Sequence, residues 1–136
     1  MTVRIVRLGS ARASGEGTRL GTVRRPPRGV AKKDFARLDW YDVWFPLLAP
    51  SPGTMKMGLE AQSTKSAARA GKLWAAFSRK YLAEMRVPAA SQALDALAAL
   101  SRHANFSVGC YCQDEARCHR SLLRALLAQR GANIAP

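Results

Sequence analysis

The chain has 136 residues, three cysteines and a net charge of +13, which comes from 22 basic and nine acidic residues. A chain of this length forms one domain, residues 1–136, and buries a core without disulfide or metal crosslinks. No apolar run is long enough to span a membrane, and there is no secretory signal to support a disulfide framework. We therefore expect a soluble, cytoplasmic protein without membrane contacts, and the sequence leaves its oligomeric state open.

The positive charge is concentrated near the N-terminus. Residues 1–37 carry ten Arg or Lys residues, against which stand only Glu16 and Asp34. Such a basic block raises the local concentration of polyanions, so nucleic acid or a phosphorylated small molecule is the expected partner. The alternative is that the charge only keeps the protein soluble.

The N-terminal half predicts short strands separated by loops. Residues 2–8, "TVRIVRL", are rich in β-branched side chains and predict a strand. Residues 9–29 hold five glycines and two prolines and support at most a short strand at 20–24. Within them "GEGTRLG", 15–21, matches no phosphate-binding fingerprint and predicts a flexible loop. Residues 39–53 combine aromatic side chains with prolines and predict a turn or short strand at one edge of the core.

The C-terminal half predicts a mobile loop followed by helices around a strand. Residues 51–65 show no periodicity and indicate the loop. Residues 66–85 place apolar side chains at i, i+3 and i+4, which is typical of an amphipathic helix. A second helix is expected from Ser91 to about His103, a buried strand over 106–112 and a last helix over 118–130. The order of elements predicts a small single-domain layered α/β fold, with a few-stranded, mainly parallel sheet and flanking helices.

The segment "CYCQDEARCHR", residues 110–120, holds all three cysteines at a strand–loop–helix junction. In open α/β sheets ligands bind beyond the carboxyl ends of the strands, where helix N-termini present free N–H groups. Alternation along the strand places Cys110 and Cys112 on one face. At the helix start His119 is expected to turn toward the sheet, and Arg120 toward a ligand or solvent.

Two chemical interpretations of this segment involve the sulfur atoms. In the first, Cys118 or Cys112 is a catalytic nucleophile, activated by the helix N-terminus and by His119 as a base. In the second, Cys110, Cys112, Cys118 and His119 bind zinc. The ligand types and count suit zinc, but the spacing is not that of a zinc finger. Without this site no cofactor is expected.

Two further interpretations need no reaction. Arg117, Arg120 and the helix N-terminus would simply bind an anion. Alternatively the cysteines and His119 are buried structural residues, and Asp114 and Glu115 cap the helix.

The preferred function is binding of a phosphate-bearing ligand, either a nucleotide or nucleic acid. Arg120 and Arg117 would contact this ligand. Arg24 and Arg25 would join them from "TVRRPPRG", 22–29, where proline stiffens an extended backbone, although a plain surface arm has the same pattern. The alternative is a small thiol-dependent or metal-dependent enzyme that uses Cys118 and His119. Whether the protein is an enzyme is open.

The ending "VGCYCQDEARCHRSLLRALLAQRGA", together with "DWYDVWFPLLAPS", "VRRPPRGV" and "RLGS", resembles the bacterial proteins grouped as domain of unknown function 488. The similarity spans nearly the whole chain, and the Cys-His-Arg at 118–120 is its most specific mark. The resemblance implies a small α/β protein with an enzymatic or nucleic-acid role. It singles out Cys112, Cys118, His119, Arg120, Asp42 and Trp44. Longer members carry a D-V-R element where this chain has Asp42-Val43-Trp44.

Overall fold

The computed structural model describes residues 1–136 as a four-stranded parallel sheet with four helices. The strands are β1 (Val3–Arg7), β2 (Thr18–Gly21), β3 (Val43–Trp44) and β4 (Phe106–Cys110). Their order across the sheet is β1-β4-β2-β3, and every pairing is parallel. This confirms the predicted α/β fold. Strand β4, the last in sequence, lies inside the sheet, and all five of its residues are buried.

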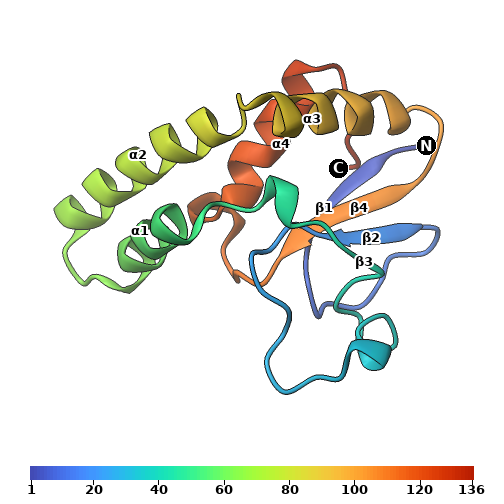
Figure 1. The fold of residues 1–136 in the computed structure, drawn as a ribbon, viewed down its shortest axis with the longest axis horizontal. Helices are drawn as coiled ribbons and strands as arrows, with labels where there is room; N and C mark the ends of the chain where they lie inside the picture. The colour runs from blue at the N-terminus through green and yellow to red at the C-terminus, as the bar shows by residue number, and fades with distance from the viewer.

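The helices are α1 (Pro52–Ser63), α2 (Ala67–Glu84), α3 (Pro88–Leu100) and α4 (His119–Gln129). Short 3-10 helices cover Lys32–Asp34, Pro46–Leu48 and Glu115–Arg117. Figure 1 shows the four helices gathered on one side of the sheet and the irregular N-terminal segments on the other. None of the helices combines the length and apolar character that crossing a membrane requires.

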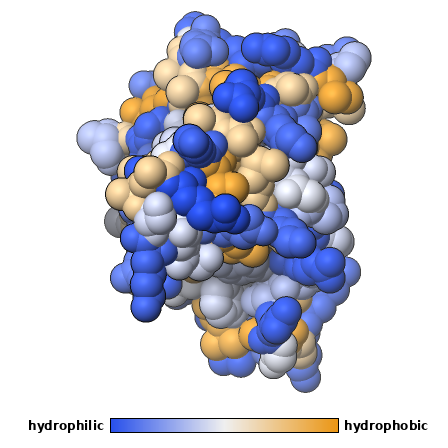
Figure 2. Space-filling view, turned by 90° about the vertical axis from the view of Figure 1, so that its left-hand side faces the viewer, coloured by the Kyte–Doolittle hydropathy of each residue, from blue (hydrophilic) through white to orange (hydrophobic).

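The main core lies between the sheet and the helices. Val3 of the edge strand β1 and Val108 of the inner strand β4 point into a cluster that includes Leu94 of α3 and Leu127 of α4, all four fully buried. Burying a side chain of this size contributes about 1.5–3 kcal/mol relative to an exposed position. Apolar residues every second position on the strands and on one face of each helix therefore fix which way the elements pack. Figure 2, which views the side where α1 ends and α2 begins, shows hydrophilic side chains interrupting the apolar ones over the surface.

The prediction of a mobile loop over 51–65 is wrong, because α1 occupies most of it. The Ser51 side chain caps the helix by accepting a hydrogen bond from the Thr54 amide. Thr54, Gly58 and Ala61 form the buried face at helical spacing. A Cβ atom on Gly58 would stand 2.9 Å from the Phe77 ring, so this glycine lets α1 approach α2 closely. Because small residues form this face, the segment lacks the pattern of large apolar side chains that predicts an amphipathic helix.

The other helices and strands agree with the sequence in type, with differences at their ends. The helix predicted over 66–85 is α2, and the one predicted over 118–130 is α4. Helix α3 begins at Pro88 rather than after Ser91, because proline suits the first turn, where an N–H has no partner. The short strand expected at 20–24 is β2, which lies two residues earlier.

The prediction of a flexible loop over "GEGTRLG", 15–21, is wrong, because residues 18–21 form β2. The segment also carries a buried ion pair on the sheet face opposite the helices. Arg19 Nε donates to Glu16 Oε2 at 2.8 Å, and the two side chains are 0% and 2% exposed. The Ser107 hydroxyl of β4 donates to the same carboxylate oxygen at 2.6 Å. Arg19 also donates to the carbonyl oxygens of Ser10 and Asp39, at 2.9 and 2.7 Å. These bonds fasten the irregular segments to the sheet.

Candidate functional site

A pocket of about 920 Å³ opens at the carboxyl edge of the sheet, the edge that the sequence predicted for a ligand. Three chain segments meet there: the end of β1 with Gly9, the arm at 22–29, and the end of β4 with Tyr111. Met55 and Leu59 of α1 and His119 at the start of α4 complete the lining. The predicted junction and the predicted basic arm therefore face one cavity.

The charge in this pocket is of one sign. Four arginines and no acidic residue contribute to the lining, namely Arg7, Arg24, Arg25 and Arg28. Arg24 is held in place, since its guanidinium donates to the carbonyl oxygens of Ala49 and Pro50, both at 3.1 Å. Arg25 and Arg28 are exposed and take part in no salt bridge, which leaves their charges free for a ligand.

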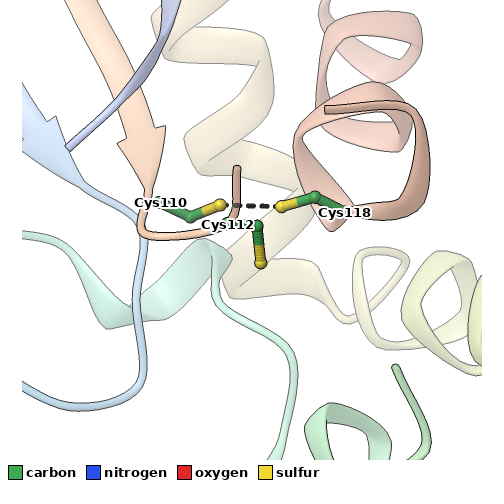
Figure 3. A group of neighbouring side chains, drawn as sticks. All are labelled: Cys110, Cys112 and Cys118. Atoms are coloured by element: carbon green, nitrogen blue, oxygen red, sulfur yellow. Dashed lines mark hydrogen bonds between the residues drawn. The ribbon is translucent and has the colours of Figure 1, made fainter. Parts of the chain in front are cut away.

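The three cysteines come together at the inner end of the pocket. All three sulfur atoms lie within 4.8 Å of one another, and none forms a disulfide. Figure 3 shows Cys110 and Cys118 pointing toward each other, with Cys112 beside them and its sulfur turned away from their line. The Cys110 and Cys118 sulfurs are 2.7 Å apart and buried, whereas Cys112 is only half-buried. Cys112 is therefore the sulfur that a ligand reaches first.

Their proximity gives the three thiols different acidities. Hydrogen bonds from Cys110 and then Cys118 lower the pKa of Cys112. The same contact with Cys112 raises the pKa of Cys110. For Cys118 the hydrogen bond with Cys110 lowers the pKa, but the contact with Cys112 and burial raise it, and the pKa is about 11. Cys112 is therefore the thiol of this group whose ionisation the other two favour.

His119 turns toward the sheet, as predicted, and is buried. Its Nε2 donates to the Thr22 carbonyl oxygen at 2.8 Å, which requires the proton on Nε2. Nδ1 consequently carries a lone pair, and it lies 3.7 Å from the Cys118 sulfur. Burial lowers the pKa of His119 to about 4, although its bond to Thr22 opposes this shift. The imidazole is neutral at physiological pH.

The structure places the two arginines of the segment differently from the prediction. Arg120 does not point to solvent: it is 4% exposed, and its Nη2 donates to the Cys112 carbonyl oxygen at 2.6 Å. Arg117 lies outside the pocket lining, 5.9 Å above the Trp74 ring. Arg117 belongs to the 3-10 helix Glu115–Arg117, which comes before α4.

The other candidate residues do not line the pocket and have structural contacts. Asp114 caps the 3-10 turn by accepting from the Ala116 amide, and Glu115 pairs with Arg124, so neither caps α4 itself. Asp42 accepts from Arg12 at 2.8 Å and from the Arg19 amide at 2.7 Å. The Trp44 Nε1 donates to the Val23 carbonyl oxygen at 2.8 Å, while the residue remains 46% exposed.

Sequence reasoning missed two aromatic residues of the pocket and one residue that contacts Cys112 from outside its lining. Trp40 and Tyr111 pack edge to face at 5.8 Å and line it together. The Tyr111 hydroxyl donates to the Arg25 carbonyl oxygen at 2.8 Å, which ties the basic arm to β4. Gln62 of α1 reaches within 3.6 Å of the Cys112 sulfur. Tyr111 stands next to both cysteines in sequence, whereas no local signal connects Gln62 with a segment fifty residues later.

A comparison with known families identifies this arrangement of segments. The family model described as the active DUF488-N3 subclade matches residues 3–131. The chain belongs to the DUF488-N3a family. The resemblance seen in the sequence is thereby confirmed, and every residue that lines the DUF488-N3a pocket lies within the matched range. Searches of curated proteins and of solved structures found no match.

Proposed function

We propose that this protein binds a phosphate-bearing ligand, a nucleotide or a nucleic-acid segment, in the pocket at the carboxyl edge of the sheet. The observation that carries the proposal is the lining itself, in which four arginines occur without a single acidic residue. A charged group in a partly enclosed site acts more strongly than in water, so several cations on one cavity favour a polyanion.

The pocket also has surfaces for the uncharged part of such a ligand. Trp40 and Tyr111 present aromatic rings, and Met55 and Leu59 add apolar contacts. Nucleobases stack on aromatic side chains with about 1–3 kcal/mol per base. The exposed Arg25 would contact phosphate, while the base enters between the aromatic and apolar walls. Arg120 does not take part directly, since its guanidinium is bound to the Cys112 carbonyl oxygen.

We expect affinity for labelled single-stranded DNA or RNA, measured by fluorescence anisotropy, to fall steeply as salt rises from about 50 to 200 mM. Replacing Arg25 and Arg28 together by alanine should reduce the slope of log K against log salt by about 1.4, because each arginine lost removes about one phosphate contact, which contributes about 0.7 on a single strand. Titration with a nucleoside triphosphate tests whether a single nucleotide suffices.

The matched control replaces Arg79 and Arg86, which are equally exposed but lie outside the pocket lining. The total charge changes by the same amount in both double variants. If the control lowers affinity as much as the pocket variant, or if binding does not depend on salt, the pocket is not the binding site.

A second candidate function is thiol-dependent or metal-dependent chemistry on the bound ligand. Cys112 favours it, because its sulfur belongs to the lining and sits beside the buried Cys118 and His119. Cys112 would act on the ligand, and Cys118 and His119 would support it from behind.

In a screen of nucleotides and phosphate esters followed by NMR, we expect Cys112→Ser to lower any turnover by about 10³-fold or more, as loss of a reacting group does. Binding of the ligand should be retained, since the arginines are unchanged. Turnover that survives Cys112→Ser would remove this residue from the reaction.

A further inference from the structure

We propose that Cys110, Cys112 and Cys118 together bind one thiophilic divalent cation, of which zinc is the commonest in proteins. The inference does not depend on the proposed ligand, because it concerns the sulfur atoms themselves. The sequence spacing, C-x-C followed by a cysteine six residues later, is not that of a zinc finger. The fold nevertheless brings the three sulfurs within reach of a single ion.

The sulfur atoms lie within about 1 Å of the separations that a metal imposes. Zinc binds thiolate at about 2.3 Å in a tetrahedral arrangement, which places two sulfur ligands about 3.8 Å apart. In the structure Cys110 and Cys118 are 2.7 Å apart, and no pair among the three sulfurs exceeds 4.8 Å. Shifts of about 1 Å, within the range of small side-chain rotations, bring all three to the distance that zinc requires. Figure 3 shows that the sulfurs come from the end of β4, its loop and the start of α4.

The buried charge of Arg120 is an independent reason to expect an anionic group here. This side chain is 4% exposed, forms no salt bridge with a carboxylate, and its Nε has no hydrogen-bond partner. The nearby Glu115 carboxylate is paired with Arg124 instead, at 2.7 Å, and a buried cation is strongly destabilising unless an anionic group lies close to it. Three thiolates on a divalent cation carry a net charge of −1, which would neutralise the guanidinium.

The arrangement around His119 is also that of a metal centre. Metal-binding histidines commonly donate their second ring N–H to a backbone carbonyl, which fixes the ring and its tautomer. His119 donates from Nε2 to Thr22, and the free Nδ1 is 3.7 Å from the Cys118 sulfur. The fourth ligand is therefore a light atom, either this nitrogen or a water oxygen from the pocket.

When Zn²⁺ binds, the three thiols lose three protons and form a tris-thiolate complex. No atom changes its oxidation state. The thiols must be reduced beforehand, because a Cys110–Cys118 disulfide would remove two ligands. The full chain is accordingly reduced with a phosphine, transferred to metal-free buffer under nitrogen, and loaded with Zn²⁺ or Co²⁺.

We expect elemental mass spectrometry to find one metal ion per chain. The absorption spectrum of the Co²⁺-loaded protein should show intense thiolate charge-transfer bands. X-ray absorption at the zinc edge should show three sulfur neighbours at about 2.3 Å and one light atom at about 2.0 Å. Scattering from the outer atoms of an imidazole ring would identify this light atom as the His119 nitrogen. If this scattering is absent, the light atom is a water oxygen.

Cys112→Ser should weaken zinc binding by more than about 100-fold, beyond what loss of an outer-shell partner produces. Because Cys112 is half-buried, circular dichroism should show an intact fold. Gln62→Ala, which removes a contact of the same sulfur without removing a ligand, should weaken zinc binding by no more than about 100-fold.

Three freely reactive thiols in the reduced protein after Zn²⁺ has been added, or fewer than three sulfur neighbours in the absorption spectrum, would overturn the proposal. These measurements need no anionic ligand. They can therefore contradict the metal site without contradicting the proposed function, and the reverse also holds.

Discussion

Replacing Glu16 by glutamine is expected to lower the free energy of unfolding by about 3–5 kcal/mol at pH 7, because it leaves the Arg19 guanidinium buried without its counter-charge. Both side chains are almost completely buried, and the carboxylate also accepts from Ser107. Urea denaturation followed by circular dichroism measures the change. Glu115→Gln is the matched control, since the Glu115–Arg124 pair is at least 32% exposed and should contribute no more than about 1 kcal/mol.

The same carboxylate predicts how stability depends on pH. Burial raises the pKa of Glu16, but hydrogen bonds from Arg19 and Ser107 outweigh this and hold it at about 2, below the ordinary value of 4.5. The stabilisation is therefore complete above pH 4.5 and is lost as the pH falls from there toward 2. The difference between the parent and Glu16→Gln should shrink over this interval. A difference that stays constant from pH 7 to 3 would contradict the assignment.

Gly17→Ala is expected to destabilise the protein by about 2–5 kcal/mol, through backbone strain and overpacking together. Gly17 has a φ of +81°, and a Cβ atom would stand 1.9 Å from the Asn105 carbonyl oxygen. The strands β2 and β4 would have to separate where Thr18 pairs with Phe106.

Gly15→Ala provides the comparison for this change. Its φ is +69°, but the nearest atom to a new Cβ is 4.0 Å away, so only the backbone penalty of about 1–2 kcal/mol applies. Equal losses in thermal melts of the two variants would show that the contact with Asn105 does not matter.

Patterns of large apolar side chains predicted most of the fold. The strand at 2–8 and the helices at 66–85 and 118–130 were identified because their periodicity is local and their ends carry caps or breakers. Helix α1 was missed because Thr54, Gly58 and Ala61 make its buried face. Packing against α2 holds this helix, and such a contact leaves no local signal in the sequence.

The sequence predicted which segment holds the candidate site, but not which way its arginine side chains point. The junction at 110–120 was found because its cysteines, His119 and arginines are adjacent in sequence. Which arginines face the cavity depends on how α4 is entered and where the arm at 22–29 lies, and both are tertiary features. Arg120 is buried and Arg117 lies outside the lining, while Arg7 and Arg28 belong to it.

The position of β4 between β1 and β2 has a consequence for synthesis of the protein. The two N-terminal strands do not pair with each other, and Val3 and Thr18 both meet Phe106, the first residue of β4. A nascent chain therefore has no central sheet until β4 has left the ribosome, and closing loops of this length slows folding. Until then the basic arm has no cavity to line, so the pocket forms only once β4 has joined the sheet.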